Sequence, residues 1–206
     1  MEHKSVPENG AGNRYAKGDV MADHDFDELT RIALRARAGD QSAAADLVRG
    51  SQADVWRLCA HLGRSRDADD LTQETYARAF ASLDRFAARS SARTWLLSIA
   101  RRVCADAIRE RARRPEGSQL LGTTELGSVD QTRSDPAETV GLRLLLDGLD
   151  AAYREAFVVT QVIGLSYAEA ADVIGCPVGT IRSRVARART ALIRGLPSDQ
   201  RRAAAD

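Results

Sequence analysis

One stretch near the C-terminal end of the chain, residues 165–194, constrains the fold more than any other part. It reads LSYAEAADVIGCPVGTIRSRVARARTALIR. Ser166 stands three residues before Glu169, which is the spacing of a capping box at a helix start. Gly175 predicts the end of that helix, because glycine adopts the left-handed conformation without steric cost, and Pro177 suits the first turn of a following helix. The stretch therefore predicts two helices joined by a tight turn.

The second of these helices is predicted to be basic on its outer face. Its apolar residues recur at helical spacing and form one buried stripe, made of Ile181, Val185, Ala188 and Leu192. No acidic residue occurs between Asp172 and Asp199. A helix-turn-helix with a basic second helix places side chains in the major groove of DNA. The alternative is a solvated arginine-rich helix in an ordinary bundle, but helix, glycine turn and basic helix together favour DNA binding.

The charge balance indicates that any basic surface is local. The chain has 206 residues and a formal net charge of +1. Its arginines concentrate in residues 101–114 and 182–194, so acidic surface must offset them elsewhere. No apolar run approaches the roughly 20 residues needed to cross a bilayer, and the first residues lack the apolar segment of a signal peptide. The sequence therefore predicts a cytoplasmic protein without membrane insertion.

Cysteine and histidine give little support to a metal or catalytic site. Cys59, Cys104 and Cys176 are odd in number and widely spaced, which argues against a disulfide framework. Cys59 and His61 could form half a metal site, but without a second ligand pair small buried thiols are the favoured interpretation. The sequence has no phosphate-binding glycine motif. We therefore expect no cofactor, no metal and no enzymatic activity.

Hydrophobic periodicity predicts an all-α protein of two helical domains joined by a flexible acidic linker. Helical spacing runs through residues 26–114 and returns in residues 138–196, and β-type alternation is absent. Residues 115–137 are rich in Pro, Gly, Ser and Thr and carry more acidic than basic residues, which predicts the linker. Residues 1–25 are expected to be a disordered extension and residues 197–206 a tail.

Three stretches together resemble one protein family, the extracytoplasmic-function (ECF) group of sigma-70 RNA polymerase sigma factors. Its two signature segments resemble DADDLTQETYARAF (67–80) and RSSARTWLLSIARRVCADAIR (89–109), and its promoter-reading motif resembles GCPVGTIRSRVARAR (175–189). The wording is closest to an actinobacterial sigma-C-like subgroup. The resemblance implies a sigma region 2 bundle for core polymerase binding and −10 recognition and melting. It also implies a sigma region 4 domain for −35 recognition.

The resemblance implies that residues 67–80 bind a coiled coil of the polymerase's largest subunit, and that the protein also contacts the flap region. Carboxylates would meet basic surface there, and apolar side chains would anchor the contact. The residues expected at this interface are Asp69, Asp70, Leu71, Gln73, Glu74 and Phe80. The alternative is that Asp67, Asp69 and Asp70 only favour a helix N-terminus, which does not explain why Gln73 and Glu74 continue the same face.

Residues 84–95 combine aromatic, basic and small polar side chains between two predicted helices. Single-stranded DNA is held by stacking and cation contacts, and a flipped base needs a pocket with polar donors. By resemblance, this loop captures the unstacked base of the melted −10 element, while nearby arginines meet phosphates. The residues expected to contact −10 DNA are Phe86, Arg89, Ser90, Ser91, Ala92, Arg93, Arg101 and Arg102. Trp95 fits either the core or a stacking platform.

The resemblance places the contacts to duplex −35 DNA early in the second helix of the helix-turn-helix. Arginine can bond guanine O6 and N7 in the major groove, whereas Ala186 allows only a short apolar contact. The residues expected to contact −35 DNA are Thr180, Arg182, Ser183, Arg184, Ala186, Arg187 and Arg189. Of these, Thr180, Arg184 and Arg189 are the expected phosphate clamps.

The main alternative function is a polymerase-independent regulator that binds duplex DNA through the helix-turn-helix. That reading leaves residues 67–80 and 89–95 without a role. Many ECF sigma factors are held by an anti-sigma factor, and the sequence leaves open whether this chain is. In the family the acidic linker threads the polymerase cleft, yet an ordinary tether would have a similar composition.

Overall fold

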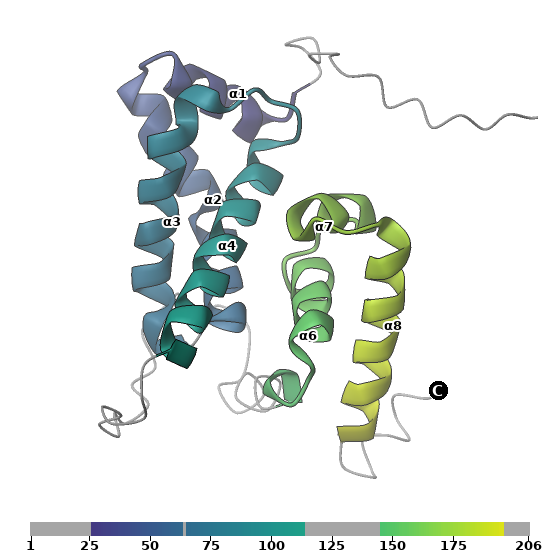
Figure 1. Cartoon of the computed structure of the whole chain (residues 1–206). Coiled ribbons are helices and arrows are strands. Elements are labelled where there is room, and N and C mark those ends of the chain that lie inside the picture. The colour runs from purple at the N-terminus through teal and green to yellow at the C-terminus, as the bar shows by residue number, and fades with distance from the viewer. Residues whose placement is uncertain (1–25, 64, 114–144, 196–206) are drawn as a thin grey trace, which may run out of the picture.

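The computed structural model describes residues 26–63, 65–113 and 145–195, which contain helices and turns but no strand. The first four helices form an N-terminal bundle: α1 (Glu28–Arg37), α2 (Gln41–Leu62), α3 (Ala68–Ser82) and α4 (Ala92–Arg113). The 3-10 turns η2 (Ser65–Asp67) and η3 (Leu83–Arg85) flank α3. Figure 1 shows α2, α3 and α4 running alongside one another with α1 across one end. The predicted all-α fold class is confirmed.

A C-terminal unit follows, in which α6 (Ala151–Phe157) and α8 (Val178–Gly195) lie side by side. The π-helical turn η4 (Val158–Val162) and α7 (Tyr167–Ile174) connect them. The helical spacing of this segment predicts a regular helix, whereas the chain widens into η4 after Phe157. The Ile163 N–H donates to the Val158 carbonyl over 2.9 Å, the five-residue spacing of a π turn. The predicted N-terminal extension, linker and tail lie outside the described residues.

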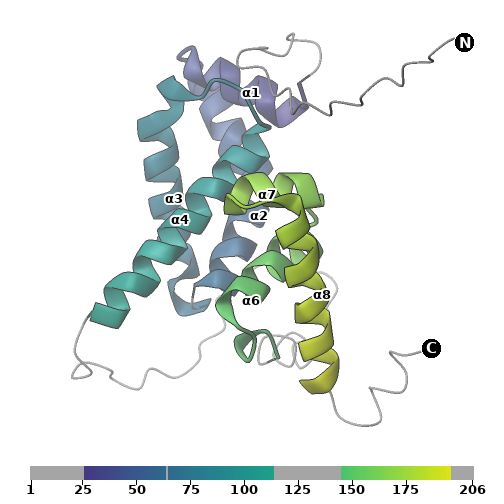
Figure 2. The same ribbon diagram turned by 45° about the vertical axis from the view of Figure 1, so that its right-hand side comes forward.

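The two bodies pack against each other in both views. α4 of the N-terminal bundle lies against α7, and α2 meets η4 (Figures 1 and 2). The buried side chains therefore form one continuous cluster through both bodies. Its largest fully buried members include Leu47, Leu58, Leu96, Leu97, Val158, Ile181 and Val185. Burying each such side chain contributes roughly 1.5–3 kcal/mol.

Two of the three cysteines lie in this core, as the sequence predicted. Cys59 on α2 and Cys104 on α4 are both buried, while Cys176 is only half-buried. The hydrogen bond between the Cys59 and Cys104 thiols, together with burial, raises the pKa of Cys104. Cys104 therefore stays a protonated thiol at neutral pH, while its hydrogen bond lowers the pKa of Cys59. Among the described residues, no cluster of three or more His, Cys, Asp or Glu side chains could hold a metal ion.

Aspartates start the first two helices. The Asp27 carboxylate accepts a hydrogen bond from the Thr30 N–H at 3.0 Å, and Asp40 accepts one from the Ala43 N–H at the same distance. The Ser42 hydroxyl also donates to Asp40. These donors, with Arg35 beside them, hold the pKa of the Asp40 carboxyl far below its usual range. Each cap satisfies a backbone donor that the helix itself leaves unpaired.

Candidate nucleic-acid and polymerase interfaces

The helix-turn-helix forms as the sequence predicts. The Ser166 hydroxyl accepts from the Glu169 N–H at 3.2 Å, and the Glu169 carboxylate accepts from the Ser166 N–H at 2.9 Å, which completes the capping box. Gly175 has φ +76° and ends α7 in the left-handed conformation. Val185 and its neighbours in the predicted stripe face inward, so α8 presents its arginine-bearing faces to solvent.

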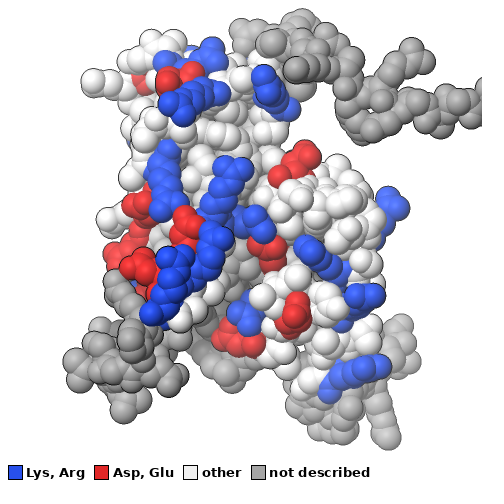
Figure 3. Space-filling view, in the orientation of Figure 1, with Lys and Arg blue, Asp and Glu red and all other residues white. Residues whose placement is uncertain are grey.

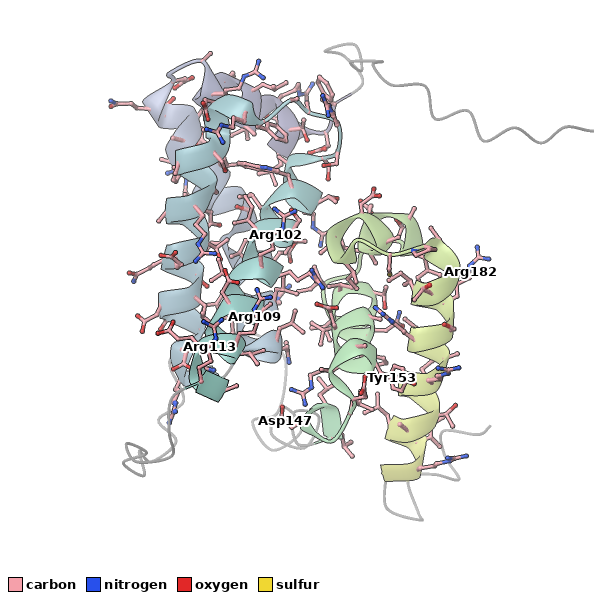
Figure 4. All side chains as sticks on the ribbon, viewed as in Figure 1. Arg102, Arg109, Arg113, Asp147, Tyr153 and Arg182 are labelled. Atoms are coloured by element: carbon pink, nitrogen blue, oxygen red, sulfur yellow. The ribbon has the colours of Figure 1, made fainter. Side chains whose placement is uncertain are left out.

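The arginines of α8 differ in how free they are. Arg182 is exposed, has no hydrogen-bond or ion-pair partner in the described part of the chain, and points away from α6 (Figure 4). Arg187 donates to the Tyr153 hydroxyl at 3.2 Å and lies 5.9 Å from the centre of the Tyr153 ring. Arg189 donates to Gln161 at 2.8 Å. Arg182 is therefore the side chain that is most available for a base edge.

The other expected −35 residues have smaller roles in the free chain. Ala186 is exposed, and the Ser183 hydroxyl donates to the Thr180 carbonyl at 3.0 Å. Thr180 and Arg184 are half-buried, with Arg184 3.9 Å from the Cys176 sulfur. An open groove of about 380 Å³ also follows α8, lined by Tyr153, Ala186, Arg187, Thr190, Ala191 and Arg194. Sequence spacing does not identify Tyr153 as a neighbour of α8, because the contact comes from another helix.

The loop predicted to capture the −10 base connects η3 to α4. Arg89 is exposed and Ser90 and Ser91 are half-exposed, while Phe86 and Ala92 are buried. Ser91 caps α4, because its hydroxyl accepts from the Thr94 N–H at 3.1 Å. Contact between DNA and Phe86 or Ala92 would require this loop to rearrange. The surface that it offers now consists of its central polar residues.

Trp95 lies at the start of α4 beside this loop. Its ring centre is 4.7 Å from that of Phe86, with the planes tilted by 38°. Trp95 is half-buried, whereas Phe86 is only 3% exposed. Packing on the buried Phe86 fits the core interpretation of Trp95. Its use as a stacking platform for DNA stays a prediction.

Two of the three predicted −10 arginines on α4 are engaged by the rest of the protein. Arg93 donates to the Asp54 carboxylate at 2.7 Å and to the Ile163 carbonyl at 2.6 Å. Arg101 donates to the Glu155 carboxylate at 2.6 Å. The contacts with Ile163 and Glu155 join α4 to the C-terminal unit, whereas Asp54 lies on α2 of the same bundle. Arg93 thereby satisfies a carbonyl just after η4 that its own helix leaves unpaired.

The outward face of α4 is different. Arg102 is exposed and has no ion-pair partner among the described residues, and Arg109 and Arg113 lie below it on the same side of the helix (Figure 4). Basic side chains run down this face, with acidic ones beside them (Figure 3). Asp106 pairs with both Arg78 and Arg109, so the face is mixed in charge rather than purely basic. Of the three predicted −10 arginines on α4, Arg102 alone is unpaired within the described ranges.

The predicted polymerase-binding residues lie mainly on the exposed side of α3. Asp69, Asp70, Gln73, Glu74 and Phe80 are exposed, and the Phe80 side chain is 39% accessible. Trp56 donates to Asp69 at 2.8 Å, and Arg78 donates to Glu74 at 2.7 Å.

Leu71 lies on the inner side of the same helix. It is only 7% exposed, so it supports the α3 face from the core rather than forming part of it. Asp69 and Asp70 stand in the first turn of α3, as the helix-start alternative requires. The Asp67 side chain, however, makes no cap hydrogen bond and instead pairs with Arg111.

Family models match both bodies of the chain. The model described as Sigma-70 region 2 matches residues 47–114, and that described as Sigma-70, region 4 matches residues 140–192. The chain is 47% identical over 169 residues to the "Probable RNA polymerase sigma-C factor" of Mycobacterium bovis and to the "ECF RNA polymerase sigma factor SigC" of Mycobacterium tuberculosis. Each alignment covers 82% of this chain and 91% of the relative.

The chain therefore belongs to the ECF sigma factors of the sigma-70 family. Proteins of this family are RNA polymerase subunits that bind core polymerase and promoter DNA and initiate transcription; the polymerase itself carries the catalysis. The subgroup that the sequence indicated agrees with the two mycobacterial relatives. In the described ranges, no helix is long and apolar enough to cross a membrane.

Solved structures of similar proteins share the fold. The structure of CnrH in complex with the cytosolic domain of CnrY aligns with a TM-score of 0.63 and 28% identity, over 80% of this chain and 95% of that one. The sigma factor RpoE of Bartonella quintana, in complex with the anti-sigma factor NepR, aligns with a TM-score of 0.61 and 29% identity. That alignment covers 73% of this chain and 93% of RpoE.

Proposed function

We propose that the chain divides initiation among three surfaces. The outer face of α3, with Asp70 and Gln73 at its centre, binds a coiled coil of the polymerase's largest subunit. The loop at residues 86–91 and the start of α4 hold the melted −10 strand. The exposed side of α8, led by Arg182, reads the duplex −35 element. The chain acts in the cytoplasm, together with its polymerase.

The observation that carries this proposal is the state of Arg182. It is exposed and without a partner in the described structure, on a helix that a completed capping box and a left-handed glycine present to solvent. A guanidinium so placed can donate two hydrogen bonds to guanine in the major groove. The acidic side chains of α3 provide a second, chemically different surface on the same chain.

The −10 surface needs a rearrangement before it can bind. Arg93 and Arg101 contact Asp54, Ile163 and Glu155, so they reach phosphates only after those contacts break. Two DNA elements on one promoter also require the N-terminal bundle and the C-terminal unit to move apart to the promoter's spacing. We infer that binding to polymerase and DNA exchanges the contacts between the two bodies for contacts with those partners.

Run-off transcription tests this function. Purified chain is mixed with core polymerase free of other sigma factors and with a pool of genomic promoter fragments. Defined transcripts that depend on the chain would support the proposal, and their start sites would reveal both promoter elements. Binding to duplex DNA without any binding to core polymerase would instead favour the polymerase-independent regulator.

A protein partner is proposed by analogy with the solved relatives. RpoE was solved with the anti-sigma factor NepR, and this chain aligns with most of RpoE. We propose that a protein of that class can hold this chain as well. Affinity capture from the source cells with wild-type chain, followed by competition with core polymerase, tests this proposal; a captured protein that core polymerase does not displace would contradict it.

A further inference from the structure

We propose that Thr30 and Arg37 of α1 are positioning residues that set the conformation of the −10 loop, and through it the choice of base in the melted strand. This inference rests on the proposed function of the loop. Both residues lie outside the stretch matched by the region 2 family model, which begins at residue 47. They reach the loop at its two ends, across 62 and 49 residues of sequence.

Thr30 holds the end of the loop at the start of α4. Its hydroxyl accepts a hydrogen bond from the Ala92 N–H at 2.8 Å and donates one to the Asp27 carboxylate at 2.7 Å. Thr30 and Ala92 are both fully buried. The Ala92 N–H belongs to the first turn of α4 and has no partner within that helix. Removal of the Thr30 hydroxyl would therefore leave a buried donor unsatisfied.

Arg37 holds the other end. Its guanidinium donates to the Phe86 carbonyl at 2.6 Å, at the point where η3 ends and the loop begins. Phe86 in turn packs its ring on Trp95. The backbone of Phe86 is therefore bound to α1, and its side chain packs against α4.

Between these two ends the backbone adopts a conformation that needs support. Ala88 has φ +49°, the left-handed region that a residue with a Cβ enters at a cost. It is the only non-glycine residue with positive φ in the described ranges. Ala88 is also buried, and the exposed Arg89 follows it directly. The two hydrogen bonds from α1 fix the ends of the segment that keeps Ala88 in place and presents Arg89 and Ser90 to solvent.

A purely structural role would have different consequences from a positioning role. If the bonds only stabilise the bundle, their loss lowers the melting temperature and leaves base choice unchanged. If they position the loop, their loss alters discrimination among bases at the unpaired position, because the polar groups of the loop no longer face the base as they do now. The ratio of affinities for the four bases, measured with one holoenzyme preparation, therefore separates the two roles.

The experiment uses holoenzyme reconstituted from core polymerase and full-length chain. Forked promoter DNA carries each of the four bases at the unpaired upstream position of the −10 element, and the ratio of dissociation constants gives the base preference. Thr30→Val keeps the shape but removes the hydroxyl, and Thr30→Ser restores it. Arg37→Gln tests the other end. Arg31→Gln is the matched control, because Arg31 lies on α1 but is exposed and pairs with Glu28.

We expect Thr30→Val to lower the preference for the best base by about fivefold or more, the effect of one unsatisfied buried donor. Thr30→Ser should restore most of it, Arg37→Gln should lower it as well, and Arg31→Gln should leave it unchanged. If Thr30→Val cannot be purified as folded protein, Arg37→Gln and Arg31→Gln still decide. An unchanged preference in Thr30→Val and Arg37→Gln would overturn the inference while leaving the proposed function intact. Absence of any preference in the wild-type holoenzyme would overturn both.

Discussion

Helices α4 and α8 both carry arginines proposed to meet DNA, but they hold them differently. On α8, Arg182 is exposed and unpaired in the described structure, and the turn that presents the helix is built from neighbours in sequence. On α4, Arg93 and Arg101 are held by Asp54 and Glu155, and the adjoining loop is held by α1. One surface is ready for its ligand, whereas the other must first release contacts within the protein.

The difference fits the form of DNA that each helix is proposed to bind. A duplex presents its base edges in a fixed groove, so a rigid helix with free side chains is enough to read it. A melted strand has no fixed shape, so the protein must supply the geometry that holds an unstacked base. A local motif can provide the first kind of surface. The second kind requires a tertiary framework.

Removal of the free arginine should have the largest effect. Arg182→Ala is expected to reduce −35-dependent initiation by about 10- to 100-fold, because a bidentate contact to guanine discriminates by roughly 1–3 kcal/mol. Arg187→Ala should act in the same direction but less strongly, because Arg187 also contacts Tyr153. Initiation from templates with and without the −35 element measures this effect. Arg49→Ala is the control, since Arg49 is exposed on α2 and pairs with Asp46. If both α8 variants initiate like the wild type, the proposed readout by α8 is wrong.

Substitution on the proposed polymerase surface of α3 should weaken binding to core polymerase rather than DNA readout. Asp70→Ala is expected to weaken binding to core polymerase by about fivefold or more, as for a residue central to an interface. Asp70 is exposed, so the melting temperature of the free chain should hardly change. Fluorescence titration of labelled chain with core polymerase measures the affinity. Equal binding by Asp70→Ala and wild type would remove α3 from the proposed interface.

The contact between α4 and the C-terminal unit predicts a gain rather than a loss. Glu155→Gln removes the carboxylate that holds Arg101, so the free chain should become more extended. It should also bind single-stranded −10 DNA severalfold more tightly, because a larger fraction of the protein molecules is then competent to bind. Small-angle X-ray scattering and fluorescence anisotropy measure the two effects. Glu28→Gln, which alters an exposed pair on α1, is the control. A variant as compact as wild type would show that this ion pair does not hold the two bodies together.

The smallest effect is expected at the capping box. Ser166→Ala removes the hydroxyl that accepts from the Glu169 N–H, and loss of such a cap costs about 1 kcal/mol. Chemical denaturation of the C-terminal unit's helices within the full chain measures this change in the free energy of unfolding. Transcription at 25 °C should be almost unaffected. A large loss of −35 readout without loss of stability would instead mean that Ser166 touches DNA.

Sequence reasoning predicted what is decided locally. The helix-turn-helix is predicted by the spacing of Ser166 and Glu169, by Gly175 and by the apolar stripe of α8, because caps and periodicity act within a few residues. The family resemblance placed Phe86 and Ala92 among the expected −10 contacts, although both are buried in the free chain.

The features that were missed are long-range. Asp54 and Glu155 neutralise Arg93 and Arg101 from other helices, Tyr153 lies against Arg187 across two helices, and Thr30 reaches the loop from α1. No spacing rule along a single chain identifies such partners, because they depend on how the helices pack. The π turn at 158–162 was also missed, because hydrophobic spacing does not distinguish a π turn from regular α-helix, and the Ile163 carbonyl after it accepts from Arg93.

The ion pairs on α4 also affect how DNA binding responds to salt. Each arginine that displaces a counterion from a phosphate of single-stranded DNA steepens the fall of log affinity with log salt concentration by about 0.7. Arg93 and Arg101 are already paired with the carboxylates of Asp54 and Glu155 in the free chain. On binding DNA, each would therefore exchange a carboxylate for a phosphate. Added salt also screens those internal pairs and frees the two arginines. A salt titration of the free chain would therefore give a slope that underestimates the number of phosphates it touches.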